Sequence, residues 1–271
     1  MEPIAQTNLQ LYNQLRRQRR SVNELSGVRR AYELASTLYS GYYQADRKPF
    51  IAHSVGVGSV LAHLDLPAEL IATGLLHNVY GNGDFGDGRK GAATRDRRRR
   101  VRNSVGERIE GLVYRFRQVR IKPDAGDDFA DRIARLDDSD RQLVLVDLAD
   151  YLEKCVDCGV LYFGDGRWVT ETLARHGGRL IDIAGELGQP RLAEMLAEAF
   201  AQVAAEPGIP QVLRGPSNRK YLSLVVPRSC RRRWYPIVSN LVRQAARPAN
   251  WSAGLHRLVK RSAGMARRRI L

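Results

Sequence analysis

The sequence predicts an all-α fold, and three observations support this prediction. Apolar residues recur at intervals near 3.6 in one segment after another, which is the period of an amphipathic helix. No apolar–polar alternation is long enough to predict a substantial sheet. The chain has 271 residues, of which 44% are hydrophobic, so it can bury one sizeable core.

Residues 22–42 and 51–64 form the first two predicted helices. In the first, six apolar residues follow helical spacing: Leu25, Val28, Tyr32, Leu34, Ala35 and Leu38. The second begins after Pro49, and its apolar stripe runs through Val57, Val60, Leu61 and Leu64. His53 lies on the same stripe. This histidine is therefore predicted to share the apolar face of its helix.

A third helix is predicted over residues 68–78. Asp65 is placed to cap it and Pro67 lies early in its first turn, and both residues favour a helix start. The glycine-rich segment 81–88 follows, with four glycines in eight positions. Such a segment is typical of a loop.

Four more helices are predicted downstream. They cover residues 104–118, 143–155, 169–187 and 190–203. A turn-rich joint then spans residues 205–211, and residues 221–226 favour a short strand. We therefore predict a helical domain over residues 1–206 and a C-terminal extension over residues 207–271.

The charge is concentrated in the C-terminal extension. Residues 207–271 contain 15 lysines and arginines and no aspartate or glutamate. The rest of the chain contains 29 basic and 29 acidic side chains, so the whole net charge of +15 belongs to the extension. A neutral domain with a cationic extension indicates an anionic partner.

Two partners fit this extension, an anionic membrane surface and nucleic acid. A stripe of apolar residues (Trp251, Leu255, Leu258 and Val259) with flanking cations favours the membrane surface, where charge and apolar burial act together. Nucleic acid would be bound through its phosphates. The sequence has neither a secretory signal nor an apolar run long enough for a transmembrane segment. We expect a cytoplasmic protein that associates peripherally with the membrane.

The cysteines do not predict a disulfide framework. Cys155 and Cys158 have the spacing of a redox pair or of half a zinc site, but no second pair follows them. The favoured interpretation is two small apolar residues on a helix.

Two histidines and one aspartate form a candidate metal site. His53 and His77 lie 24 residues apart on successive predicted helices, which can pack as an antiparallel pair. Asp150 would join them from a third helix. Imidazole nitrogens and a carboxylate suit a divalent Mn, Fe or Zn ion. The spacing alone also permits histidines that are buried for structural reasons.

The residues around these positions resemble a known family. The matching segments are Lys48-Pro-Phe-Ile-Ala-His53, Leu75-Leu-His77, Val105-Gly-Glu-Arg-Ile-Glu-Gly-Leu-Val and Leu148-Ala-Asp150. Through them, residues 25–160 resemble the hydrolase domain of the bacterial (p)ppGpp (alarmone) enzymes, which are members of the HD phosphohydrolase superfamily. The resemblance implies an HD-type helical bundle with His53, His77 and Asp150 as metal ligands.

The chain departs from this family at several positions. Asn78 stands where the superfamily has a metal-bound aspartate. Gly81 and Asn82 stand where the alarmone hydrolases have an acidic pair around the attacking water. The arginine of the family's guanosine site aligns with Gln44, and nearby Arg47 is the candidate substrate-binding residue.

These departures are predicted to weaken the metal site. Asn78 removes one negative charge, and with it part of the polarisation of a bound water. Asp147, Asp84 and Asp87 are candidates to restore that charge. The segment His77-Asn-Val-Tyr-Gly resembles a less characterised HD-like subgroup. Tyr80 is then either a phenol at the mouth of the site or a core aromatic residue.

The candidate catalytic residues are therefore Asn78, Tyr80, Asn82 and Asp84. The resemblance implies a metal-dependent phosphohydrolase that acts on a phosphate ester or a pyrophosphate, with a nucleotide-like substrate. The alternative is a catalytically inactive HD-like module that binds or senses a ligand at an anionic membrane surface or on nucleic acid.

Overall fold

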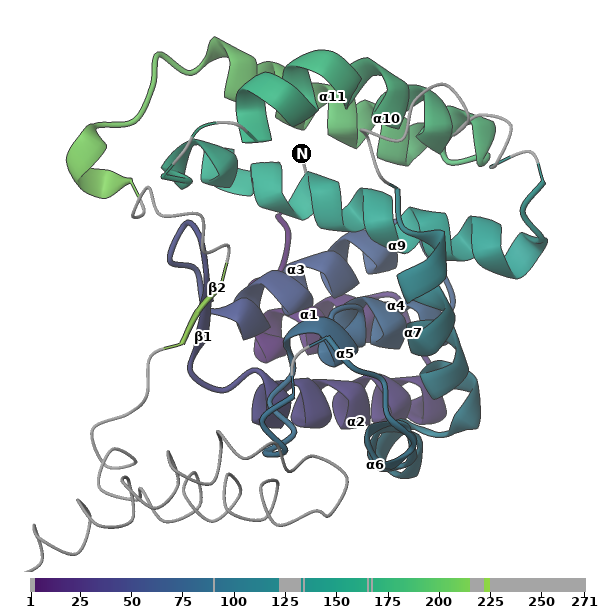
Figure 1. The fold of residues 1–271 in the computed structure, drawn as a ribbon. Helices are drawn as coiled ribbons and strands as arrows, with labels where there is room; N and C mark the ends of the chain where they lie inside the picture. Colours follow the sequence, from purple (N-terminus) through teal and green to yellow (C-terminus); the bar gives the residue numbers. More distant parts are fainter. Residues whose placement is uncertain are drawn as a thin grey trace, which may run out of the picture. The chain divides into compact units, whose positions relative to one another are not determined.

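The structure is a computed structural model that describes residues 3–89, 91–121, 133, 135–164, 166, 168–214 and 222–224. Helices dominate these residues, so the predicted all-α class is confirmed (Figure 1). Residues 1–83 and 90–225 group into one compact unit, called the helical body below, and the loop at residues 84–89 groups outside it. The predicted division at residue 206 stays a prediction.

Two capped helices open the helical body. Helix α1 (Asn8–Arg17) was not among the predicted helices, and it begins with a capping box between Thr7 and Gln10. Helix α2 (Val22–Leu38) begins with the same arrangement between Ser21 and Glu24. In each box the hydroxyl accepts from a backbone N–H of the first turn, and the longer side chain reaches back to the cap.

Helices α3 (Phe50–His63) and α4 (Ala68–Leu76) pack as a close hairpin. Glycine makes the close approach possible, because a Cβ atom on Gly74 would lie 2.6 Å from Leu61 Cδ1 and 3.5 Å from the backbone nitrogen of Gly58. This packing brings the first turn of α3 beside the end of α4. The centroids of the His53 and His77 rings are therefore only 5.3 Å apart.

The turn between α3 and α4 differs from the prediction in one respect. Asp65 does not cap α4, which has Pro67 at its N-cap position and no side-chain cap. Asp65 instead adopts a positive φ of 53° within the turn, and its carboxylate pairs with Arg20 at 2.5 Å. The tight turn therefore uses Asp65 for its left-handed conformation, which aspartate tolerates better than most residues.

Three helices follow the hairpin. The short helix α5 (Val79–Asn82) continues from α4, and the predicted loop follows it. The predicted helix over residues 104–118 corresponds to α7 (Glu107–Val119), and α6 (Arg95–Val105), which was not predicted, precedes it. They divide at Gly106, whose φ of 92° is unfavourable for any other residue.

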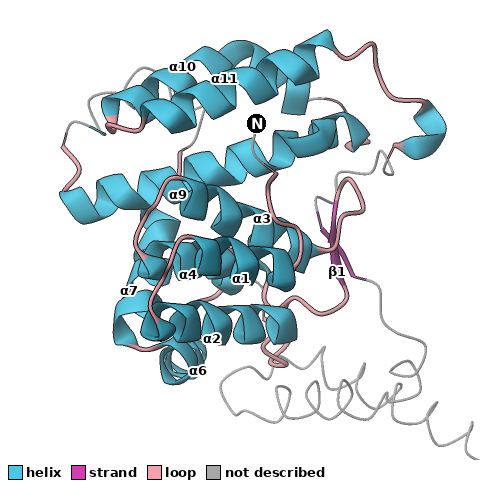
Figure 2. Cartoon of the chain, turned by 180° about the vertical axis from the view of Figure 1, so that it is seen from behind, coloured by secondary structure: helices cyan, strands magenta, loops and turns pink. Residues whose placement is uncertain are grey.

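Helix α9 (Asp138–Cys155) lies at the centre of the helical body. It packs against α3, α4 and α7 on one side and against α10 (Ala174–Glu186) and α11 (Pro190–Ala205) on the other (Figures 1 and 2). Its residues from Leu143 to Cys155 are buried except Lys154, and they include three carboxylates. Shorter helical turns complete this part: η2 (Val156–Tyr162), η3 (Trp168–Leu173) and η4 (Gln211–Leu213).

A two-stranded ribbon joins distant parts of the helical body. Strand β1 (Tyr42–Gln44) pairs antiparallel with β2 (Leu222–Leu224), so the predicted strand near residue 221 is confirmed. Apart from β2 and residues 207–214, the basic extension lies outside the described residues. Among the helices that are described, none combines the length and apolar character needed to span a membrane.

Candidate metal centre

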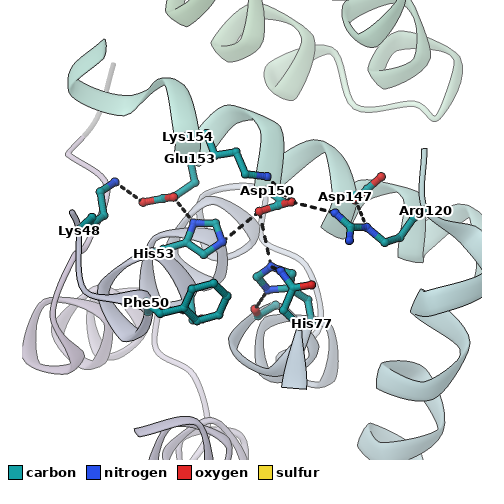
Figure 3. A network of polar contacts seen from close by, with 12 residues as sticks. Lys48, Phe50, His53, His77, Arg120, Asp147, Asp150, Glu153 and Lys154 are labelled. Atoms are coloured by element: carbon teal, nitrogen blue, oxygen red, sulfur yellow. Dashed lines mark hydrogen bonds and ion pairs between the residues drawn. The ribbon is translucent and has the colours of Figure 1, made fainter. Parts of the chain in front are cut away.

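The three predicted metal ligands converge on one point. His53 comes from the first turn of α3, His77 directly follows α4, and Asp150 lies on α9 (Figure 3). Oδ1 of Asp150 is 3.0 Å from Nε2 of His53 and 3.5 Å from Nε2 of His77. The three residues are only 0–2% exposed, and one ligand atom from each lies within 4.8 Å of the others.

The orientation of these atoms fits a divalent cation. Although Nε2 of His53 and Oδ1 of Asp150 are neighbours, they are not aligned for a hydrogen bond, and neither has another hydrogen-bond partner among the described residues. Two ligands at right angles around an ion, each bonded at about 2.1 Å, would be about 3.0 Å apart. A shared cation satisfies both buried atoms at the spacing observed.

Hydrogen bonds fix which nitrogen of each ring faces the site. Nδ1 of His77 donates to the carbonyl oxygen of Gly74 at 2.6 Å, and Nδ1 of His53 donates to the Glu153 carboxylate. Both acceptors lack a proton of their own, so each ring carries its proton on Nδ1. Each histidine therefore presents Nε2 as the metal-binding nitrogen.

Asn78 lies directly against this ligand set. Its Nδ2 is 2.8 Å from Nε2 of His77, so its amide donates to the nitrogen that would bind the metal. Turning the amide would exchange its nitrogen for Oδ1, a neutral oxygen ligand. Asn78 can therefore compete with a metal ion or bind beside it, but it contributes no negative charge.

Glu153 is a functional residue that the sequence analysis missed. It is fully buried on α9, its Oε2 accepts from His53, and its Oε1 accepts from the Lys48 ammonium at 2.7 Å. A carboxylate behind a metal-binding histidine orients the ring and strengthens it as a ligand. In the sequence, Glu153 lies one helical turn after Asp150 within an apolar segment. This spacing is the signal from which Glu153 could have been predicted to lie near the site.

Two cations hold the second oxygen of Asp150. Oδ2 is 2.6 Å from Lys154 Nζ and 3.5 Å from Arg120 Nη2. Burial alone would raise the pKa of Asp150, but Lys154 and the two imidazoles hold it well below the usual range. The carboxylate is therefore ionised, with one oxygen toward the histidines and the other toward the cations.

Asp147 does not join the ligand set. Its carboxylate accepts from the backbone N–H of Ile121 at 2.6 Å and pairs with Arg120 at 3.3 Å. Burial raises its pKa to about 6, although Arg120 opposes the shift. The charge removed by Asn78 is thus not restored by Asp147, which instead positions the chain at the end of α7.

Tyr80 is a buried aromatic residue of the core and not a phenol at the mouth of the site. Its hydroxyl donates to Glu110 at 2.9 Å, and its ring packs edge-on against Tyr114. Burial and the Glu110 carboxylate raise the pKa of its phenol far above 10. Tyr80 therefore anchors the segment that follows His77.

Three further predicted residues, Asn82, Asp84 and Arg47, are described by their local surroundings. Asn82 ends α5, and Asp84 accepts from the backbone N–H of Gly86 within the loop. Arg47 is exposed in the turn after β1, with a φ of 71°. These residues stay predictions as catalytic or substrate-binding groups.

Cys155 and Cys158, two of the three cysteines of the chain, are free thiols. Cys155 ends α9, where burial raises its pKa to about 12, and Cys158 lies in η2 with a positive φ of 53°. Cys158 is therefore not part of the α9 helix, contrary to the prediction. A raised pKa makes a poor thiolate, which argues against redox use of Cys155.

Metal binding is expected to weaken as the pH falls. Burial alone would lower the pKa of His53, but the Glu153 and Asp150 carboxylates raise it above 6.5. Because protonated His53 cannot bind a metal, affinity for Mn²⁺ should fall about tenfold per pH unit below that pKa and level off above it. Mn²⁺ titrations between about pH 6 and pH 8.5 measure this. An affinity that does not change over this range would contradict it.

Gly56→Ala is expected to weaken metal binding through Glu153. A Cβ atom on Gly56 would lie 2.5 Å from Cγ and 2.7 Å from Oε1 of Glu153, so the Glu153 side chain must shift and its contact with His53 is disturbed. We expect about a tenfold loss of Mn²⁺ affinity. Gly111→Ala is the matched control, because a Cβ atom there meets nothing within 4 Å. Equal Mn²⁺ affinity in both variants would contradict the role given to Glu153.

Comparison with known proteins adds one family match. Residues 36–120 match a family described as a domain of unknown function, DUF6817. The match runs from the end of α2 to Arg120 and includes His53, His77 and Asn78, but it ends before α9 and Asp150. No curated protein matches the chain.

Proposed function

We propose that the protein is a divergent HD-type, metal-dependent phosphohydrolase that acts on a phosphate ester or a pyrophosphate. The observation that carries this proposal is the buried convergence of two Nε2 atoms and one carboxylate oxygen from three helices. Two further cations, Arg120 and Lys154, lie beside this centre. Imidazole, carboxylate and nearby cations together suit the hydrolysis of an anionic substrate.

Each residue has a defined part in this proposal. His53, His77 and Asp150 hold the ion, while Glu153 orients His53. When bound, a divalent ion supplies a Lewis acid for a phosphoryl oxygen and lowers the pKa of water. Asn78 borders the site without adding charge, so the affinity for the ion is lower than an aspartate would give.

A second candidate is a binding module without catalysis. It is favoured by the hydrogen bond from Asn78 to Nε2 of His77, which occupies the nitrogen that a metal would use. In this case the same residues would contribute to binding a nucleotide or another metabolite without an ion.

Elemental analysis tests the two candidates. The purified protein should contain about one equivalent of Mn, Fe or Zn, as a single site requires. His77→Ala should lose it, whereas His176→Ala, which removes a histidine of α10, should retain it. A phosphate ester and pyrophosphate screen follows. Absence of metal from the wild type even after incubation with excess Mn²⁺ would overturn the hydrolase proposal and favour the binding module.

We also propose that residues 207–271 bring the protein to an anionic membrane surface or to nucleic acid. Their 15 cations without a single acid support this. Co-sedimentation with anionic vesicles, compared with gel shifts on duplex DNA, distinguishes the two partners. Binding to neither would contradict the proposal.

A further inference from the structure

The charges around the metal centre indicate what kind of ligand completes it. Within the described part of the chain, six charged side chains are linked to one another or to the histidines by ion pairs: Lys48, Arg120, Lys154, Asp147, Asp150 and Glu153. Their formal charges cancel. Asp46 contacts this network through the backbone N–H of Lys48, at 2.8 Å. A divalent ion held by two neutral imidazoles therefore brings positive charge that these carboxylates do not offset, which favours an anionic ligand.

The geometry of Asp150 places two of the cations beside the ion. Oδ1 faces the histidines, and Oδ2 of the same carboxylate is 2.6 Å from Lys154 and 3.5 Å from Arg120 (Figure 3). The two cations come from different elements, Lys154 from the last turn of α9 and Arg120 from the residue after α7. An anion bound next to Asp150 would be within reach of both.

Solvent exposure distinguishes these two cations from the ligands. The side chains of His53 and Asp150 are each 1% exposed, whereas Lys154 is 18% and Arg120 is 41% exposed. Lys48 is 20% exposed, but the Glu153 carboxylate separates it from the ligands. Arg120 and Lys154 are therefore accessible to an anion from solvent while they contact the buried Asp150.

The chemistry of the two side chains suits a phosphoryl group. The Arg120 guanidinium is a planar fork that matches phosphate oxygens, and its Cζ lies 5.7 Å from the ring centroid of Phe116. Phe116 in turn packs edge-on against His77. The guanidinium is thus positioned relative to a metal ligand through one aromatic ring.

We infer that Arg120 and Lys154 form, with the metal, a binding site for a terminal phosphoryl dianion. This inference rests on the proposed function and narrows its substrate class to phosphate monoesters and terminal pyrophosphates. A diester phosphate has one negative charge fewer and is bound less tightly by the same cations.

Isothermal titration of the Mn²⁺-loaded full-length protein with inorganic phosphate and with dimethyl phosphate tests this. Wild type should bind phosphate at least about tenfold more tightly than dimethyl phosphate. Lys154→Asn and Arg120→Gln should each weaken phosphate binding by about tenfold or more, because each removes a charged hydrogen-bond donor. Arg117→Gln is the control, because Arg117 is an exposed arginine of α7.

Arg120→Lys keeps the positive charge but removes the planar guanidinium, so its phosphate affinity should lie between those of the wild type and of Arg120→Gln. This variant replaces Arg120→Gln in the test if the glutamine variant does not fold. Metal content is measured on the same samples, to show which variants retain the ion under these conditions. Unchanged phosphate binding in variants that retain the metal would overturn the inference alone. If no metal binds at all, the proposed function fails. Phosphate binding that still depends on Arg120 and Lys154 would then support the anion site, and its absence would overturn both.

Discussion

Glu153→Ala is expected to lower Mn²⁺ affinity by about 10- to 100-fold, because it removes the acceptor that orients His53. The variant also leaves the Lys48 ammonium without the carboxylate that it contacts at 2.7 Å. We expect a loss of about 1–3 kcal/mol in the free energy of unfolding from this unpaired charge. Mn²⁺ titration and denaturant unfolding of the same variant measure the two effects.

Glu153→Gln is the matched control for this prediction. Its amide oxygen can still accept from His53, but its amide nitrogen then faces Lys48 and repels it. Metal affinity should therefore lie between that of the wild type and that of the alanine variant. Wild-type affinity in Glu153→Ala would show that His53 needs no support from α9.

Glu110→Ala is expected to cost about 1–3 kcal/mol of unfolding free energy, because it removes the buried acceptor of the Tyr80 hydroxyl and of two partly exposed arginines. The Glu110 side chain is 1% exposed and joins three helices. It accepts from Arg98 of α6 at 2.6 and 3.0 Å, from Arg102 at 3.3 Å and from Tyr80 of α5 at 2.9 Å. Its removal should also loosen the segment between His77 and the glycine loop.

Glu107→Ala tests whether the loss of stability in Glu110→Ala depends on the position of Glu110 or only on the removal of one negative charge. Glu107 is an exposed acid in the first turn of the same helix, so its removal should cost about 0.3–1 kcal/mol through the helix dipole. Denaturant unfolding compares the two variants. Equal losses would contradict the role of Glu110 as the junction of α5, α6 and α7.

The helices that were predicted best are the most apolar ones. Helices α3 and α4 are almost entirely apolar or small, and they were predicted to within a few residues. Helix α6 was missed because six arginines in eight positions conceal its buried face, which consists of Arg97, Val101 and Val105. From the sequence alone, an arginine is assigned to the protein surface. Arg97 is buried instead, and its guanidinium donates to the carbonyl oxygen of Ala92.

For the site, the sequence predicted the metal ligands but not the residues that surround them. The ligand triad was named in advance because its residues follow a known frame, and the structure brings them together. The groups that surround it could not be assigned. Whether Lys48 meets Glu153, 105 residues away, depends on how α3 packs against α9. Sequence spacing carries no information on such contacts.

The ribbon of β1 and β2 affects how the helical body can be isolated. Strand β1 lies just before the turn that carries Lys48, and the backbone N–H of Gln44 donates to the carbonyl of Lys48 at 2.9 Å. A chain shortened at residue 206 would lose β2, expose an open strand edge prone to aggregation, and loosen the support of Lys48. A shortened chain that ends after residue 225 would keep both strands and the ion pair with Glu153.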